Sequence, residues 1–450
     1  MTRHVDVTTV LETIQPELST GEFAKVIAHI SPASPAQTAD ILERLPEDQQ
    51  PIFYRLLPKD RATAVFDILR PRQQSDLIKG LQNKEVVEIF DGLDPDDRAL
   101  LLDELPANLS TRLLQGLSGE KRRHTTNLLG YPKDSIGRRM SPHVVSTRET
   151  YTAGETLARI QNHLEDAETV YTIPVVDDAR RVVGVVGLRQ LLGAKAEDKI
   201  GDLMSTVHPA SAYASAEETA RLCIELRLLA MPIVDREGRL LGILTVDDAG
   251  RIIEHAETED TALSGGVEPL GRPYFSTPVR SLVRSRIVWL LVLAIGATLT
   301  VHVLSLFEAT LAQVTALALF VPLLIGTGGN TGNQAATTVT RAIALGDVGN
   351  SDLVRVLGRE FSVGLTLGAL LGTLGALITG AIFGVSIGIT IGLTLLGICT
   401  IAASIGGVMP MIAKKLGVDP AVFSNPFIST FVDASGLIVY FLIAKAVLGL

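Results

Sequence analysis

The sequence predicts a multidomain protein in which an all-α N-terminal superhelical domain and an α/β tandem repeat precede an α-helical membrane domain with five transmembrane helices. Three observations support this prediction: prolines punctuate a run of short helices, two later segments repeat each other at an offset of 58 residues, and five long apolar stretches follow. Charge divides the chain at the same place. Residues 287–450 carry six acidic and six basic side chains, so the formal net charge of −9 belongs to residues 1–286.

The helical domain is predicted over residues 1–132. Its repeat units end in LERLP, YRLLP, DILRP, DGLDP and LDELP, with prolines at positions 46, 58, 71, 95 and 106. Proline cannot continue a helix but is accepted in the first turn of the next one, so each unit contains one short helix. The 24-residue interval before Pro95 then holds one unit without its proline. Stacked short helices of this kind form a solenoid.

The α/β repeat is predicted over residues 133–254. The segment IPVVDDARRVVGVVGLRQLL at 173–192 matches MPIVDREGRLLGILTVDDAG at 231–250, and each copy reads as strand, helix, strand, strand, helix. This pattern resembles a pair of CBS domains, a regulatory module common at the cytosolic end of channels and enzymes. The ribose-binding pattern Thr-x-x-Asp of that module is present as Thr245 and Asp248, whereas the first copy has Gly187 and Gln190 in those places. ATP binding would therefore rest on the second copy alone.

Five spans are placed at about residues 287–307, 313–342, 361–383, 388–413 and 426–447, each long enough to cross a bilayer as a helix. Arginines or lysines precede the first span, flank the loop after the second and follow the fourth, and the two opposite loops have none. The positive-inside rule then places the N-terminus in the cytosol and the C-terminus outside. We expect a multi-pass protein of the cytoplasmic (inner) membrane.

The second span is the least lipid-like of the five, because it contains GTGGNTGNQAATTVTR at 326–341. Asn330, Asn333 and Gln334 supply amide groups that must face protein or water rather than lipid. A polar seam between helices is one interpretation of this stretch, and the wall of an ion pathway is the other.

Asp433 lies in the fifth span, about 10 Å along the helix from Pro426. An ionised carboxylate inside a bilayer is stable only where it meets water, a cation or a partner. It can be protonated or paired with His302 of the first span, or it can bind a cation on a pore axis, with Asn425 as a second oxygen ligand or as the helix N-cap. Oxygen ligands without a Cys or His cluster favour Mg²⁺, Ca²⁺ or Mn²⁺.

Several classes of function find no support in the sequence. The pattern GxxxxGK[ST] of a nucleotide-driven pump is absent, the histidines are scattered without a nucleophile–base pair, and no basic cluster favours nucleic acid. Cys223 and Cys399 lie far apart in different kinds of segment, which argues against a disulfide or a CxxC metal site. We expect no enzyme activity and no nucleic-acid partner.

The helical domain, the CBS pair, the five spans, GTGGNTGNQ in the second span and SNPFISTFVDASG in the fifth together resemble the MgtE family of magnesium channels and transporters. The resemblance covers nearly the whole chain. It implies a homodimer whose pore is lined by the second and fifth helices, with hydrated Mg²⁺ bound at Asp433. Asn330, Asn333 and Asn425 correspond to pore-lining residues. The resemblance also implies a connecting plug helix over residues 255–280, before a membrane domain at residues 281–450.

In that family, cytosolic Mg²⁺ closes the pore by bridging acidic residues of the helical domain, the CBS pair and the plug helix. The matching acids in this sequence are Asp96, Asp97, Glu217, Asp247, Asp248, Glu259 and Asp260. Arg227, Arg251 and Leu100 stand where acidic residues of the sensor are expected. A fixed guanidinium can replace Mg²⁺ between carboxylates, so we expect the sensing of Mg²⁺ to be weakened. The alternative for each single acid is a solvated surface charge.

The residues and the resemblance together predict a magnesium channel or facilitated transporter that moves Mg²⁺ into the cytosol down its electrochemical gradient. The alternative is a proton- or sodium-coupled secondary transporter of Mg²⁺, Mn²⁺ or Co²⁺, in which Asp433 alternates between proton and ion. Dependence of the flux on a pH or Na⁺ gradient separates the two.

Overall fold

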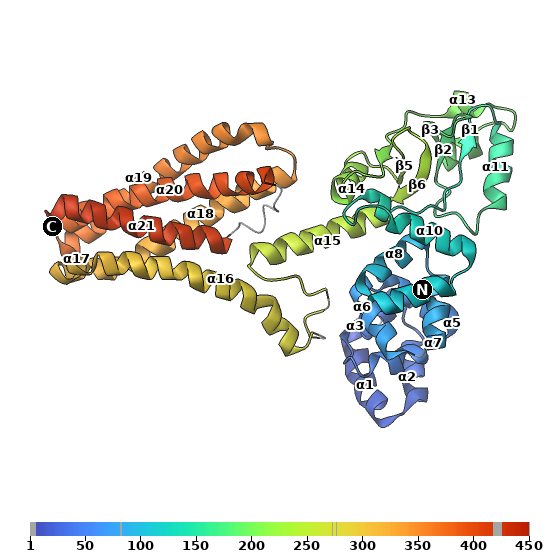
Figure 1. The fold of residues 1–450 in the computed structure, drawn as a ribbon, viewed down its shortest axis with the longest axis horizontal. Coiled ribbons are helices and arrows are strands. Elements are labelled where there is room, and N and C mark those ends of the chain that lie inside the picture. Colours follow the sequence, from blue (N-terminus) through green and yellow to red (C-terminus); the bar gives the residue numbers. More distant parts are fainter. Residues whose placement is uncertain (1–5, 82, 272, 276, 417–424, 450) are drawn as a thin grey trace. The chain divides into compact units, whose positions relative to one another are not determined.

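The computed structural model describes residues 6–449 except residues 82, 272, 276 and 417–424 (Figure 1). The chain forms two compact units. The first contains the residues up to 256 together with residues 271–278, and the second contains residues 257–270 and 279–450.

Short stacked helices make up the beginning of the first unit. In the part of the chain that the structure describes, they are α1 (Val7–Thr20), α2 (Phe23–Ile30), α3 (Pro35–Arg44), α4 (Gln50–Arg55), α5 (Lys59–Ile68), α6 (Pro71–Gly80), α7 (Asn83–Gly92), α8 (Pro95–Glu104), α9 (Ala107–Gly116) and α10 (Gly119–Leu129). From α5 onward each helix starts 12 residues after the one before it. Helix α7 is the unit without a proline, which confirms the repeat hidden between Pro71 and Pro95. Phe53, Phe66 and Phe90 are buried in the core that runs through the stack.

Two copies of one α/β motif follow, with the predicted element order. The first copy contains β1 (Thr147–Arg148), α11 (Ala153–Asn162), β2 (Thr172–Val176), β3 (Val182–Gly187) and α12 (Leu188–Gly193). The second contains β4 (Ala210–Ser211), α14 (Ala216–Glu225), β5 (Ala230–Val234), β6 (Leu240–Thr245) and α15 (Val246–Ser264). Each copy has a three-stranded sheet in which the first strand runs parallel to the second and the second antiparallel to the third. A register shift falls at the same place in both, at Val175/Val176 and at Ile233/Val234.

The two copies are joined by reciprocal strand contacts. Ser141, which follows the short helix η1 (Ile136–Arg138) and precedes the first copy, bridges to Ile243 in β6 of the second copy. Ser205, which follows α13 (Ile200–Leu203) and precedes the second copy, bridges to Val185 in β3 of the first. The segment before each copy therefore pairs with the sheet of the other copy.

The segment expected as a separate plug helix differs from the prediction. Helix α15 begins at Val246, inside the second CBS copy, and runs without a break to Ser264, and residues 265–278 are not helical where the structure describes them. Gly265 and Gly266 end the helix, with Gly266 at a φ of 65° that favours glycine, and prolines at 269, 273 and 278 prevent its continuation. The connecting helix is thus the second half of the last CBS helix.

The second unit contains long helices of the length that crosses a bilayer. They are α16 (Val279–Leu306), α18 (Val321–Ala344), α19 (Leu353–Phe383), α20 (Val385–Lys415) and α21 (Asn425–Leu448), with the short α17 (Glu308–Gln313), η2 (Thr315–Phe320) and η3 (Asn350–Asp352) between them. Four of these helices, α16, α19, α20 and α21, are long and apolar enough to span a membrane, and α18 is the polar fifth. The predicted second span started too early, because η2 precedes Pro322 in the first turn of α18.

Glycines allow these helices to approach closely. Gly364, Gly368 and Gly372 of α19 lie four residues apart, and a Cβ atom at any of them would come within 2.8 Å of α20 backbone atoms. Figure 1 shows α19 and α20 side by side as an antiparallel pair. Helix α18 meets α20 in the same way, because a Cβ atom at Gly406 would overlap the carbonyl oxygen of Gly332. Small residues at such seams are the usual means of packing helices in lipid.

Candidate functional site

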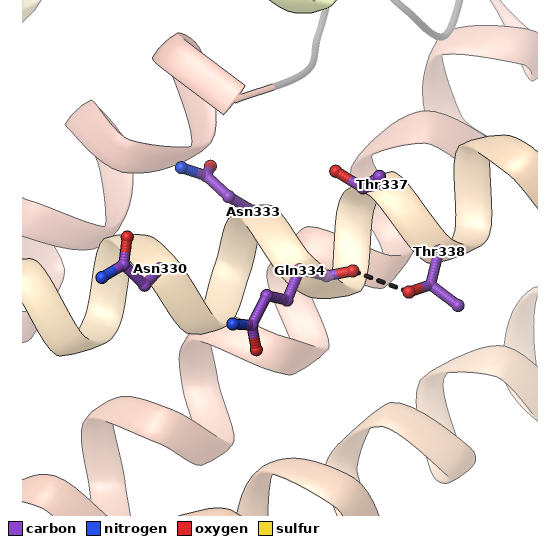
Figure 2. Close-up of a pocket in the computed structure, with 5 residues that line it drawn as sticks. All are labelled: Asn330, Asn333, Gln334, Thr337 and Thr338. Atoms are coloured by element: carbon purple, nitrogen blue, oxygen red, sulfur yellow. Dashed lines mark hydrogen bonds between the residues drawn. The ribbon is translucent and has the colours of Figure 1, made fainter.

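A stripe of polar side chains runs along α18. Asn330, Asn333, Gln334, Thr337 and Thr338 line an open pocket of about 350 Å³, and Figure 2 shows them on one stretch of the helix. Their spacing of three, four, seven and eight residues places them on one face. Asn330 and Asn333 were expected to line the pore because of the family resemblance. Thr337 and Thr338 were not, although the same helical spacing from Asn330, Asn333 and Gln334 could have found them.

Helix α21 brings a carboxylate and a hydroxyl group next to this stripe. Asn333 Nδ2 donates a hydrogen bond to Ser429 Oγ at 3.0 Å. A Cβ atom at Gly329 would lie 3.5 Å from Ser429 Oγ and 3.9 Å from Asp433 Oδ1. Because Gly329 has no side chain, the face of α21 that carries Ser429 and Asp433 can lie directly against α18.

Asp433 is half-buried and has no ion-pair partner among the described residues. His302 is exposed on α16 and does not pair with it there. Asn425, the other predicted ligand of the fifth span, has a side chain that lies outside the described residues. No group of three or more Asp, Glu, His or Cys side chains in the described part of the chain is arranged to hold a metal ion. The membrane site is therefore a single carboxylate beside amide and hydroxyl groups, which suits an ion that keeps its water shell.

The first unit gathers a second set of acids between α8 and the CBS pair. Asp96 is 6% exposed, and its Oδ1 atom has no hydrogen-bond partner among the described residues. Burial and the nearby carboxylates of Asp248 and Glu168 raise the pKa of Asp96 well above its usual range. Burial, Asp96 and Asp67 raise the pKa of Asp97 to about 9. The sequence did not reveal Asp67 and Glu168, since only the fold brings them to this cluster.

Arg251 brings a positive charge into this acid cluster. Its guanidinium donates to Asp248 Oδ1, and Thr245 Oγ1 donates to the other oxygen, Asp248 Oδ2, at 2.7 Å. Burial opposes the charge of Arg251, but the carboxylates of Asp248, Asp97 and Asp67 outweigh it and raise the pKa of the guanidinium. Both oxygens of Asp248 are therefore engaged, whereas Asp96 Oδ1 finds no donor within the described ranges.

Comparisons with known proteins agree with this arrangement. Family models match the chain for the MgtE divalent cation transporter over residues 321–443, the MgtE intracellular N domain over residues 33–134, and the CBS domain over residues 134–197 and 200–254. The magnesium transporter MgtE of Thermus thermophilus is 34% identical over 443 residues, which cover 97% of this chain and 98% of that protein. The chain belongs to the MgtE family. The resemblance seen in the sequence is thereby confirmed, and the family is one of transporters rather than enzymes.

Other MgtE proteins give the same result. The magnesium transporter MgtE of Bacillus subtilis is 30% identical over 428 residues, which cover 94% of each chain. The crystal structure of the cytosolic domain of the Mg²⁺ channel MgtE in complex with ATP is 30% identical, with a TM-score of 0.50, and the match covers 54% of this chain and 99% of that one. The helical N domain and the CBS pair therefore have the fold of an MgtE cytosolic domain.

The remaining residues predicted for the MgtE sensor are not all in the acid cluster. Glu217 pairs with Arg221 on α14 at 2.9 Å, and Asp247 is exposed, although it lies within electrostatic reach of Glu168. Glu259 and Asp260 lie on the half of α15 that belongs to the second unit.

The three departures from the MgtE sensor pattern also differ from one another. Arg227 is exposed at the end of α14 with a left-handed backbone, φ 54°, and has no carboxylate partner among the described residues. Leu100 is partly buried in α8 and brings no charge. Of the three, Arg251 alone places a positive charge among the acids.

Proposed function

We propose that this MgtE-family protein is a homodimeric Mg²⁺ channel or facilitated transporter of the cytoplasmic membrane, with the N-terminus in the cytosol, which passes Mg²⁺ inward down its electrochemical gradient. The single observation that carries the proposal is Asp433, an intramembrane carboxylate without an ion-pair partner in the described part of the chain, whose Oδ1 would lie 3.9 Å from a Cβ atom at Gly329, the residue before the polar stripe of α18. The ion itself is supported by the names of the relatives, which are magnesium transporters.

The chemistry of the site fits a hydrated divalent ion. Mg²⁺ sheds its waters reluctantly, and the bound waters direct their hydrogens outward, so a pathway must offer acceptors to them. The Asp433 carboxylate and the amide and hydroxyl oxygens of Asn330, Asn333, Gln334 and Thr337 are such acceptors. A two-fold symmetric dimer would bring two copies of Asp433, which together balance one divalent charge.

Regulation by cytosolic Mg²⁺ is proposed to be weaker than in a sensor built from acids alone. Arg251 already pairs with Asp248 and lies within electrostatic reach of Asp97 and Asp67, so it supplies part of the positive charge that a metal ion would bring to the acid cluster. Within the described residues Asp96 keeps an oxygen without a partner, and together with Glu168 it is the place where a divalent cation would still bind. Residual sensing would then act through Asp96.

ATP is proposed as a weak ligand of the second CBS copy. Thr245 and Asp248 retain the ribose-binding pattern, and a homologous cytosolic domain was solved with ATP. Arg251 competes for Asp248, and the first copy uses Gln190 to accept a hydrogen bond from the Gly187 backbone at 2.8 Å instead. Titration with labelled ATP should show weak binding that tightens in Arg251→Gln.

Flux into liposomes tests the main proposal. Purified protein is reconstituted with an enclosed Mg²⁺-sensitive dye, and the wild type is compared with Asp433→Ala. Ser435→Ala is the matched control, because the Ser435 hydroxyl donates to the Phe431 carbonyl oxygen of its own helix at 2.9 Å. We expect flux in the wild type and the control and none in Asp433→Ala. Equal flux in all three would remove Asp433 from the pathway.

The coupled-transport alternative is tested in the same liposomes. An intramembrane carboxylate without an ion-pair partner could also exchange a proton for an ion. Flux that stops when the pH and Na⁺ gradients are abolished, at constant Mg²⁺ gradient and membrane potential, would favour coupling. Flux that follows only the Mg²⁺ gradient and the membrane potential favours a channel.

A further inference from the structure

Ser429 of α21 and Asn333 of α18 are joined across the boundary between the two helices. Asn333 Nδ2 lies 3.0 Å from Ser429 Oγ, and the opposite contact, from Ser429 Oγ to Asn333 Oδ1, is longer at 3.4 Å. In the shorter contact the amide nitrogen donates to the hydroxyl oxygen, and in the longer one the hydroxyl group donates to the amide oxygen. Both polar atoms of the Asn333 amide therefore reach the Ser429 hydroxyl group, and the nitrogen is the nearer of the two.

The orientation of this amide matters for a hydrated cation. A carboxamide presents a donor on one side and an acceptor on the other. Water bound to Mg²⁺ directs its hydrogens outward, so it is bound by the amide oxygen and repelled by the amide NH₂ group. Ser429 makes its shorter bond to the amide nitrogen and only a 3.4 Å contact to Asn333 Oδ1, so the second lone pair of that oxygen is available to a water of the ion.

The same hydroxyl group lies beside the carboxylate of the site. Ser429 precedes Asp433 by one helical turn, so both side chains are on one face of α21. Both approach Gly329, where a Cβ atom would be 3.5 Å from Ser429 Oγ and 3.9 Å from Asp433 Oδ1. Asn333 follows Gly329 by four residues on α18, which places its amide over the same region. Figure 2 shows Asn333 on the stretch of α18 that also carries Asn330 and Gln334.

We propose that Ser429 is a positioning residue for ion permeation: it fixes the Asn333 amide so that the amide oxygen accepts hydrogens from the waters of a divalent cation held at Asp433. This inference rests on the proposed function. Ser429 does not itself need to touch the ion. Its loss frees the amide to rotate, which weakens the binding of the hydrated ion without removing the carboxylate.

The test is a double-mutant cycle on Mg²⁺ flux in liposomes. Ser429→Ala should raise the half-saturating Mg²⁺ concentration roughly three- to tenfold, the effect of one lost neutral hydrogen bond, with maximal flux within about twofold of wild type. Asn333→Ala should give a similar rise, and the double variant should be no worse than either single one. Ser429→Thr keeps the hydroxyl group and should restore the wild-type value.

Several outcomes would overturn the inference. They are a Ser429→Ala variant that matches the Ser435→Ala control, additive effects of Ser429→Ala and Asn333→Ala, and a Ser429→Thr variant as weak as Ser429→Ala. If Ser429→Ala does not insert into membranes, Ser429→Cys replaces it, since a thiol of similar size is a poor acceptor and must raise the half-saturation in the same way.

The controls separate this inference from the proposed function. Flux that depends on Asp433 but not on Ser429 would reject the positioning role and leave the magnesium pathway standing. Absence of flux in the wild type, or flux that is unchanged in Asp433→Ala, would reject the pathway itself and the role of Ser429 with it.

Discussion

The substitution Gly368→Ala tests the seam on which the membrane helices are built. Gly364, Gly368 and Gly372 of α19 face α20, and α20 in turn meets the polar helix α18 at Gly406. A Cβ atom at position 368 would lie 2.8 Å from both the Cα and the carbonyl oxygen of Leu396. Ordinary van der Waals contact begins at 3.4 Å, so α19 and α20 must separate by about 0.6 Å.

The expected cost follows from two opposing effects. Alanine is favoured over glycine within a helix by about 1 kcal/mol, whereas forcing an extra methyl group into a packed interior costs about 1–3 kcal/mol. The obstructing atoms of Leu396 belong to the backbone and cannot rotate away, and separation would also loosen the contacts at Gly364 and Gly372. The cost therefore falls in the upper part of its range, about 2–3 kcal/mol, and the net loss in the free energy of unfolding is about 1–2 kcal/mol.

Thermal unfolding of the full-length protein in detergent, followed by the loss of its monodisperse gel-filtration peak, measures this effect. Gly368→Ala should melt about 2–8 °C below wild type. Gly358→Ala is the control, because Gly358 lies on the same helix and is exposed, and a methyl group added there would have no described heavy atom of a neighbouring element within 4 Å. Equal or higher melting temperatures for both variants would refute the close packing of α19 on α20.

Three further predictions concern the first unit and the segment before α16. Arg251→Gln should make protease resistance of the first unit strongly dependent on Mg²⁺, because Asp248 and Asp97 lose their fixed cation; equal dependence in wild type and variant would contradict this. Asp97 binds a proton in the folded state up to a pKa of about 9, far above that of an unfolded Asp, so the stability of the first unit should fall as pH rises from about 4 to about 9. Protection factors for amide hydrogen exchange in α8, which correct for the intrinsic exchange rate at each pH, would contradict this if they stayed constant over the range. Trp289 is the single tryptophan, and its Nε1 donates to Glu268 Oε1 at 3.0 Å. Glu268→Ala should therefore shift the maximum of the tryptophan fluorescence, and Glu268→Gln should shift it less. An unchanged fluorescence spectrum in Glu268→Ala would contradict the contact.

Local chemistry explains which parts of the fold were predictable. Proline fixes the start of a helix wherever it occurs, so the repeat of the helical domain could be read even across α7, which lacks one. The end of the connecting helix was predicted less well, although Gly265, Gly266 and the later prolines carry the signal, because the expected range came from a resemblance rather than from these residues.

The candidate sites could be predicted only in part, because their residues come from distant parts of the sequence. Asp96 and Asp97 could be named from the sequence, but their neighbours Asp67 and Glu168 lie about 30 and 70 residues away, and only the packing of α8 on the CBS pair joins them. Ser429 was also missed. A serine in a membrane helix most often bonds to its own backbone, so its contact with Asn333 on another helix could not be inferred from the sequence. Contacts between side chains on different elements leave no pattern in a single sequence.

Helix α18 combines two properties that oppose each other in a lipid-facing helix. Its glycines face the neighbouring helices: Gly328 lies against Ile398 and Val432, and Gly332 against Ile428 and the backbone of Ala402. Its amide and hydroxyl side chains lie on the open pocket that begins at Asn330 and ends at Thr338. In a bilayer, a monomer would turn these polar groups toward hydrocarbon, at a cost of several kcal/mol for each group without a partner. A second copy placed over this face would enclose the polar stripe with water between two Asp433 carboxylates. The polar composition that makes α18 the least suited of the long helices to span a membrane alone therefore supports the proposed dimeric pathway.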